Sequence, residues 1–130
     1  MPDMPTQRAT GRIDVMSYDV KPYDTSGPFT ISEVTITEEF SGGLAGVGSV
    51  RVILVTEPDE TVHFTGMERF LGELADRSGS FILRNSGTMK DGVLESTWKI
   101  IPGSGTEGFE AIRGDGGCNP SGYVLDYWFE

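Results

Sequence analysis

Glu68 and Asn85 are the two residues of this chain best placed to do acid–base chemistry. From Val62 to Phe70, every second residue is apolar or Gly except Glu68, and from Phe81 to Gly87 the exception is Asn85. Such alternation is typical of strands with one buried face. Burial penalises a charged carboxylate, so the pKa of Glu68 should rise toward the range useful to a general acid or base. Asn85 could orient that carboxyl group, a water or a substrate carbonyl.

The dipeptide Asp91-Gly92 predicts the register of the hairpin that follows Asn85. Asp-Gly is among the strongest signals for a two-residue β-hairpin turn. A two-residue loop places Lys90 opposite Val93, and counting outward places Asn85 opposite Trp98. The indole of Trp98 would then offer a flat wall to an apolar or cationic ligand.

A second hairpin is predicted between the strand that holds Glu68 and the strand that holds Asn85. Keeping the two apolar faces together pairs Phe70 with Phe81 and leaves Glu68 diagonal to Asn85, about 7–8 Å away between backbones. We therefore predict Glu68 and Asn85 as catalytic candidates inside one cavity. The alternative is a structural Glu68 that pairs with an arginine.

Other aromatic and aliphatic residues are predicted to line the same cavity. The last strand, Tyr123 to Glu130, alternates so that Tyr123, Leu125 and Tyr127 face inward. The predicted cavity set is Trp98, Tyr127, Phe64, Phe81, Leu83 and Tyr18.

The first two predicted strands leave one question of orientation open. In Arg8 to Tyr18, Ile13 and Val15 lie on one face, and Met16 and Tyr18 on the other. In Phe29 to Phe40, apolar and acidic residues occur on both faces. If one face turns inward, Glu33 or Glu39 joins Glu68; if the other does, which we favour, both are surface carboxylates.

Composition points to one all-β domain. The chain has 130 residues, of which 37% are hydrophobic, with 18 Gly and 7 Pro between strand-like runs. We assign residues 1–7 to a loosely ordered tail and residues 8–130 to the domain. Seven or eight strands in an antiparallel meander leave two unpaired edges unless the sheet closes into a barrel. The glycine-rich stretch from Gly114 to Gly122 reads as a loop.

Net charge and cysteine content limit the binding partners and the cellular location that we expect. The formal net charge of −10 argues against nucleic acid and anionic membranes, which need clustered basic residues. No apolar run approaches the roughly 18 residues of a membrane span. A lone cysteine, Cys118, excludes an internal disulfide and makes the cytoplasm the default location. Whether the chain forms a homodimer stays open.

Two further motifs do not lead to a site. Gly103 to Gly108 matches G-x-G-x-x-G, but no crossover helix fits in the residues that follow, so we expect a loop that binds no nucleotide. His63 is the only histidine and lies on the more polar face of its strand. Without a second His or a Cys nearby, we expect no metal site.

The chain resembles a bacterial family known as domain of unknown function 3224, over most of its length. The resemblance is carried by Gly66-Met67-Glu68-Arg69-Phe70, Arg77-Ser78-Gly79-Ser80-Phe81, Ser86-Gly87-Thr88, Trp98, Ile101-Pro102-Gly103-Ser104-Gly105-Thr106 and Leu125-Asp126-Tyr127. That family is grouped with allene oxide cyclase-like barrels. The resemblance thus implies a closed eight-stranded antiparallel barrel with a central cavity, and no established activity. Family members often carry His at the position of Asn85 and a longer, His-bearing loop near Cys118, so this pocket should be drier.

These patterns together predict a cofactor-free barrel that binds one hydrophobic small molecule. Two functions compete. The cavity could act as a cyclase or isomerase by confinement, with Glu68 transferring a proton. Alternatively, it could bind or carry a lipid-like compound without chemistry.

Overall fold

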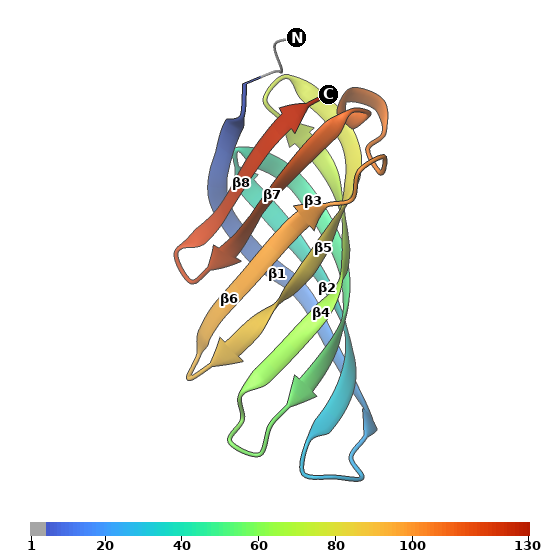
Figure 1. The fold of residues 1–130 in the computed structure, drawn as a ribbon, viewed down its shortest axis with the longest axis vertical. Coiled ribbons are helices and arrows are strands. Elements are labelled where there is room, and N and C mark those ends of the chain that lie inside the picture. Colours follow the sequence, from blue (N-terminus) through green and yellow to red (C-terminus); the bar gives the residue numbers. More distant parts are fainter. Residues whose placement is uncertain (1–4) are drawn as a thin grey trace.

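Eight antiparallel strands form a closed ring in the computed structural model, which describes residues 5–130. Figure 1 shows the strands in chain order around the ring, with the first described residues and the C-terminus at the same end. A short 3-10 helix, η1, precedes β7. The elements are β1 (Gln7–Asp24), β2 (Thr30–Gly42), β3 (Leu44–Thr56), β4 (Val62–Leu74), β5 (Arg77–Lys90), β6 (Val93–Ile100), η1 (Glu107–Phe109), β7 (Ile112–Asn119) and β8 (Gly122–Phe129).

Each strand pairs with its neighbours in sequence, and β1 closes the ring by pairing with β8. This confirms the predicted meander. The closing contact is short, because β8 pairs with β1 only from Gln7 to Gly11. Beyond Gly11, β1 continues along β2 alone as far as Asp24. Gln7 therefore belongs to β1 rather than to the predicted tail, of which residues 1–4 lie outside the described residues.

The predicted registers in the middle of the chain are confirmed. Asp91 and Gly92 both have positive φ, 51° and 77°, as a two-residue hairpin turn of the mirror-image type requires. Lys90 therefore lies opposite Val93, and Asn85 lies opposite Trp98. The preceding hairpin likewise pairs Phe70 with Phe81 as predicted.

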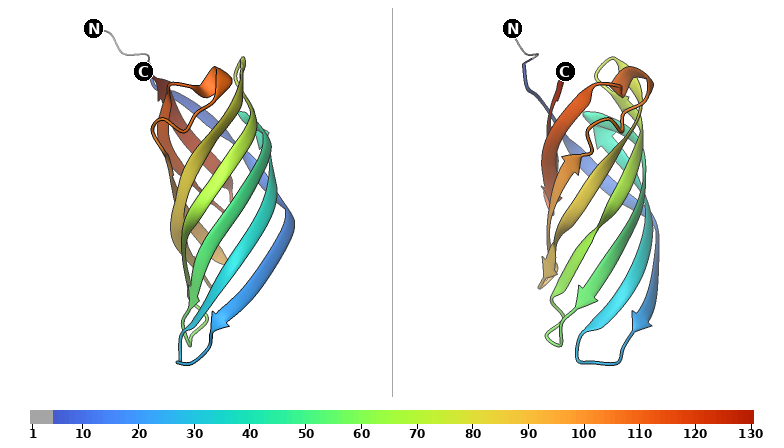
Figure 2. Two further views of the ribbon diagram at one scale, coloured as in Figure 1. Left: turned by 90° about the vertical axis from the view of Figure 1, so that its right-hand side faces the viewer. Right: turned by 45° about the vertical axis from the view of Figure 1, so that its right-hand side comes forward.

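One end of the ring is filled by a packed core. Phe70 and Phe81 lie with their ring centroids 5.1 Å apart, and Phe109 of η1 contacts Phe81 edge-on at 5.3 Å. All three rings are fully buried. η1 thus closes this end, and Figure 2 shows it beside the ends of the strands, near the C-terminus. We call these residues, with their buried neighbours, the packed end: Ala9, Phe40, Leu44, Phe70, Leu74, Phe81, Leu83, Trp98, Ile100, Phe109, Ile112, Tyr123, Leu125 and Tyr127.

The other half of the ring is hollow. A smaller buried cluster there consists of Val34, Val50 and Val52, with Ile36, Leu54 and Phe64 packed against it. These side chains come from β2, β3 and β4, which extend far past β7 and β8 (Figure 1). The opposite strands β7 and β8 are shorter, with eight residues each against thirteen in β2, β3 and β4. We call this part the hollow end.

A β-bulge in β1 places Val15 and Tyr18 on the same face, whereas the sequence predicts them on opposite faces. The pairing with β2 shifts between Val15 and Ser17, so that Met16 has no partner. The extra residue changes the alternation, and Tyr18 comes to lie on the same face as Val15 rather than with Met16. Tyr18 therefore faces the hollow end.

The stretch from Gly114 to Gly122 is mostly a strand, which corrects the loop prediction. β7 pairs with β8 over its whole length and with β6 from Asp115 to Cys118. Its glycines allow close approach, because a Cβ on Gly116 would lie 2.0 Å from the carbonyl oxygen of Val124. Glycine-rich composition here reflects tight packing of backbones rather than flexibility. Within residues 5–130, no helix is long and apolar enough to cross a membrane.

Candidate functional site

Glu68 and Asn85 meet between the packed end and the hollow end. They are 1% and 6% exposed, and the Asn85 amide Nδ2 donates to Glu68 Oε1 over 3.1 Å. One oxygen of each residue has no hydrogen-bond partner, Oε2 of Glu68 and Oδ1 of Asn85. Buried polar atoms without partners are costly, so each of them calls for an explanation.

A second carboxyl group, that of Glu38, lies close to Glu68. Burial, then hydrogen bonding and charge repulsion from Glu38, together raise the pKa of Glu68 to about 10, and the Asn85 hydrogen bond opposes them. Glu68 is therefore protonated at neutral pH, and its carboxyl group has a proton that it can donate toward Glu38.

Backbone pairing brings these two carboxyl groups together. Glu38 lies opposite Gly48 in the β2–β3 pair, and Val50 of the same face of β3 lies opposite Glu68 in β4. Gly48 leaves the space that the carboxyl group needs, since a Cβ there would lie 2.0 Å from Glu68 Oε2. A glycine in the middle of a strand is thereby accounted for.

The sequence-based prediction missed Glu38. It left open whether Glu33 or Glu39 faces the cavity, and both lie on the outer face of β2, which is the favoured alternative. Glu33 forms an exposed ion pair with Arg51 at 3.3 Å. The inner face is the one with Val34 and Phe40, both of which are buried. The large aromatic side chain of Phe40, two residues after Glu38 and on the same face, was the signal that could have identified it.

The hollow end contains a cavity of about 420 Å³ that ends at this pair. This volume lies within the roughly 300–1,000 Å³ typical of small-molecule sites. Its walls are aliphatic or aromatic for the most part. They are formed by Arg12, Ile13, Val15, Tyr18, Val34, Ile36, Glu38, Val50, Val52, Leu54, Val62, Phe64, Asn85, Met89, Leu94, Ser96, Trp98, Cys118, Asn119, Pro120 and Gly122.

Comparison with known proteins identifies the family. A family model described as "Protein of unknown function (DUF3224)" matches residues 9–130. The chain belongs to the DUF3224 family. A similar solved structure is the crystal structure of a DUF3224 protein of unknown function from Shewanella oneidensis MR-1, with 19% identity and a TM-score of 0.75, covering 97% of this chain and 98% of that chain. No curated protein matches the sequence.

In this DUF3224 protein, the predicted cavity residues divide between the two ends of the ring. Trp98, Phe64 and Tyr18 line the cavity. Phe81 and Leu83 are fully buried in the packed end instead, which corrects their assignment.

Tyr127 also belongs to the packed end, and its hydroxyl donates to Gln7 Oε1 over 2.8 Å. Like Phe81 and Leu83, it points inward as predicted but lies too far toward the η1 end to reach the cavity. Glu68 itself lies behind the wall, so Glu38 and Asn85 are the polar side chains of this group that border the cavity.

Cys118 borders the cavity from β7, opposite Ser96 of β6. Burial and, to a smaller extent, the charge of Glu38 raise its pKa to about 11. The thiol is therefore neutral and a poor nucleophile at neutral pH.

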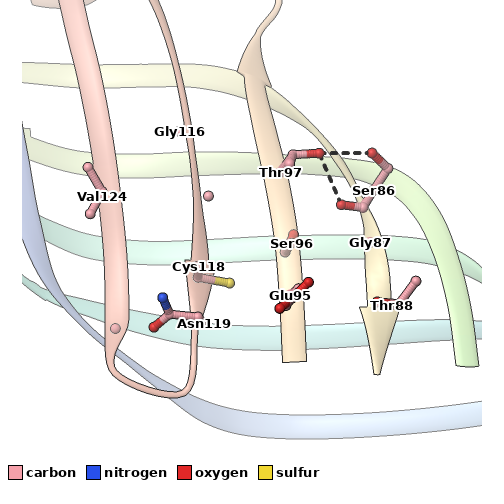
Figure 3. Close-up of a pocket in the computed structure, with 12 residues that line it drawn as sticks. Ser86, Gly87, Thr88, Glu95, Ser96, Thr97, Gly116, Cys118, Asn119 and Val124 are labelled. Carbon is pink, nitrogen blue, oxygen red and sulfur yellow. Dashed lines mark hydrogen bonds between the residues drawn. The ribbon is translucent and has the colours of Figure 1, made fainter. Parts of the chain in front are cut away.

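A separate depression lies over β5, β6, β7 and β8 (Figure 3), and it is open to solvent along most of its length. The hydroxyls of Ser86 and Thr97 lie 3.2 Å apart there, within hydrogen-bond distance. Its volume of about 520 Å³ exceeds that of the cavity, but it lacks the apolar enclosure that binds small molecules. We therefore place the candidate site in the cavity.

The glycine motif from Gly103 to Gly108 and the single histidine, His63, lie outside the cavity. Residues 103–106 form a loop, as expected, and only the short η1 follows it. His63 is exposed and contacts Glu57 at the far tip of the hollow end. Among residues 5–130, no group of three or more His, Cys, Asp or Glu side chains could hold a metal ion.

We expect Gly48→Ala to destabilise the fold by about 1–3 kcal/mol, the usual cost of overpacking. The new methyl group would displace the Glu68 carboxyl group and press on Phe40, whose Cε1 would lie 2.9 Å from the new Cβ. Denaturant unfolding measures the loss. In a Glu68→Ala background the cost should shrink, whereas a fully additive double variant would contradict this explanation. Gly27→Ala, where a Cβ would meet no atom within 4 Å, is the control.

Proposed function

We propose that the ring is a β-barrel of the allene oxide cyclase-like kind, whose cavity binds one hydrophobic small molecule without a cofactor and isomerises or cyclises it. The observation that carries this proposal is the proximity of Glu38, which borders a mostly apolar cavity, to the buried Glu68, whose pKa is raised. Perturbed carboxyl pairs of this kind are common at sites of proton transfer. The family resemblance supports the barrel type and supplies no activity.

In this mechanism Glu38 is the group that touches the substrate. Its carboxylate removes a proton from one atom of the substrate and returns it to another, so that the protein ends as it began. Glu68 remains protonated and donates its hydrogen bond to Glu38, which prevents two adjacent negative charges. Asn85 fixes Glu68 through Oε1. The sequence assigns the proton transfer to Glu68. In this mechanism Glu38 transfers the proton, and Glu68 positions Glu38.

The apolar walls contribute by confinement. A flexible substrate held among Val34, Val52 and Phe64 loses conformations that do not lead to product, and the exclusion of water strengthens the electrostatic effect of Glu38. These side chains come from three neighbouring strands, and the first two are buried.

A binding or carrier function is the second candidate. It is favoured by the rim of the cavity, where Val15 and Tyr18 of β1 are 59% and 58% exposed. An open apolar rim suits exchange of a lipid-like ligand more than it suits sequestration of a reaction. Turnover by the wild-type protein and loss of turnover in Glu38→Gln would favour the enzyme, because a lost general base costs about 10²–10⁴-fold in rate.

We expect Val52→Phe to abolish binding of an uncharged apolar probe such as N-phenyl-1-naphthylamine. Val52 is buried and lines the cavity, so the larger ring would occupy the space of the ligand. Ile53→Phe is the matched control, since Ile53 is the next residue of β3, faces outward and is 39% exposed. Fluorescence titration should show saturable binding to the wild type and to Ile53→Phe only. Equal binding by all three proteins would place the probe elsewhere.

Partners and location stay predictions. The formal charge of −10 continues to argue against nucleic acid and anionic membranes.

A further inference from the structure

We propose that the ligand of this cavity is a hydrophobic amine, bound as its ammonium ion, with the cationic head against Glu38 and Asn85 and the apolar body toward the rim. This inference rests on the proposed function, in that it names the class of molecule that the same cavity takes. It is carried by the arrangement of hydrogen-bond acceptors at the inner end of the cavity.

The inner end offers acceptors that have no donor. One N–H of the Asn85 amide is used by Glu68 Oε1, while Asn85 Oδ1 has no hydrogen-bond partner, although Asn85 lines the cavity and is only 6% exposed. The carboxyl group of Glu38 borders the same cavity and adds two acceptor oxygens. A ligand head with several donors suits these acceptors, and an ammonium group brings three.

Charge at the inner end favours a cation over a neutral donor. Glu38 brings a formal negative charge to the cavity wall, and its neighbour Glu68 is only 1% exposed. The Cys118 thiol beside them is neutral because its pKa is raised to about 11. Attraction between unlike charges is strong where water is scarce, so an ammonium head gains more here than a hydroxyl group.

The indole of Trp98 provides a second feature that suits a cation. Trp98 lies opposite Asn85 in the β5–β6 register and lines the same cavity. Its ring stacks on Tyr123 on the packed side, with centroids 5.8 Å apart. A cation within about 6 Å of an indole face is attracted by the negative potential of the ring.

The cavity offers few cationic groups to an anionic ligand head. Arg12 is the one cationic residue among those that line the cavity in the described part of the chain, and it is exposed to solvent. Water and salt screen an exposed charge. Carboxylates such as fatty acids are therefore expected to bind weakly, in spite of the apolar walls.

Entry of an ammonium ion also changes the protonation of the pair. A nearby cation stabilises the carboxylate form, so it lowers the pKa of Glu68 from its raised value. Binding at neutral or mildly alkaline pH should then release protons to the buffer. The pair consists of Glu38 from β2 and Glu68 from β4. The other titratable groups near it are Cys118 from β7 and Arg12 of β1, which lies at the cavity wall.

The test compares decylamine, decanol and decanoate, which share one alkyl chain and differ in the head. Isothermal titration calorimetry is run on the full-length protein below micelle-forming concentrations, in two buffers with different ionisation enthalpies. We expect one site per chain, with decylamine bound about tenfold or more tighter than decanol and decanoate weakest. Proton release should accompany decylamine alone.

Two variants separate the cavity from the acidic surface, because a protein of charge −10 attracts cationic amphiphiles anywhere. Glu38→Gln should weaken the binding of decylamine far more than the binding of decanol. Glu39→Gln changes the next residue, on the outer face of β2, and should weaken the binding of neither compound. Val52→Phe should abolish the binding of both. Circular dichroism confirms that each variant is folded before it is titrated.

Three results would overturn the inference. If decanoate binds as tightly as decylamine, the cavity binds a hydrophobic molecule but the head is not cationic, and the proposed function survives. If decylamine binds equally to Glu39→Gln and Glu38→Gln, its head does not contact Glu38. If no compound binds in a way that Val52→Phe abolishes, the inference and the proposed function fail together.

Discussion

Glu68→Gln should flatten the pH dependence of stability across the neutral and alkaline range. The folded protein raises the pKa of Glu68 from 4.5 to about 10, so between these values the folded state binds a proton that the unfolded state has released. Stability is therefore complete below about pH 4.5 and is lost as pH rises, by as much as about 1.4 kcal/mol for each pH unit. Gln keeps the shape of a neutral Glu and has no proton to lose.

Chemical denaturation at several pH values between 5 and 9 measures this effect. The amide of Gln can accept from Asn85 and donate to Glu38, so the variant should equal the wild type at pH 5 and exceed it at pH 9. Glu73→Gln, an exposed residue of the same strand, is the control and should follow the wild-type curve. If Glu68→Gln instead has a lower free energy of unfolding than the wild type at every pH, a charged Glu68 stabilises the fold.

Phe81→Ala should cost about 3–5 kcal/mol, whereas Phe64→Ala should cost much less. Phe81 is fully buried between Phe70 and Phe109, so its removal leaves a hole that rigid neighbours cannot fill. Phe64 is partly exposed and already borders the cavity, so its removal enlarges an existing space.

Urea unfolding of both variants checks this difference. Val52→Ala, at a buried cavity position, extends the comparison with a smaller side chain. Equal losses for Phe81→Ala and Phe64→Ala would mean that the hollow end is as well packed as the end closed by η1, and would remove the basis for a ligand cavity.

Local sequence signals predicted the middle of the ring well. The Asp91-Gly92 turn allows only one pairing of its strands when both residues take positive φ, and the partners of Asn85 follow by counting. Alternation then identified Glu68 as an inward carboxyl group. Both signals depend on neighbours in sequence, which is why they needed no knowledge of the whole fold.

Position along the axis of the ring could not be predicted in the same way. Alternation shows that Leu83 and Asn85 point inward, but not that Leu83 lies in the packed end and Asn85 at the cavity. That depends on how far each strand is tilted and staggered relative to its neighbours, which is a property of the closed sheet. The same limit explains Tyr127, whose strand is short and lies near the packed end.

Glu38 was missed for a different reason. The strand from Thr30 to Gly42 carries apolar and acidic residues on both faces, so the period of two is present but its phase is ambiguous. The bulge at Met16 adds a second ambiguity, because no residue type marks it. In each case the pairing partner decides, and partners become known only from the folded chain.

The lower part of β1 has a consequence for how the protein behaves at high concentration. From Arg12 to Asp24 no strand in the described chain pairs with its second edge, so its free N–H and C=O groups can template another strand. The bulge at Met16 bends this edge, and Pro22 removes one donor from it. Outward charges on Asp14, Asp19 and Lys21 add repulsion against stacking. Substitutions that remove the bulge or these charges should therefore promote aggregation long before they affect the core.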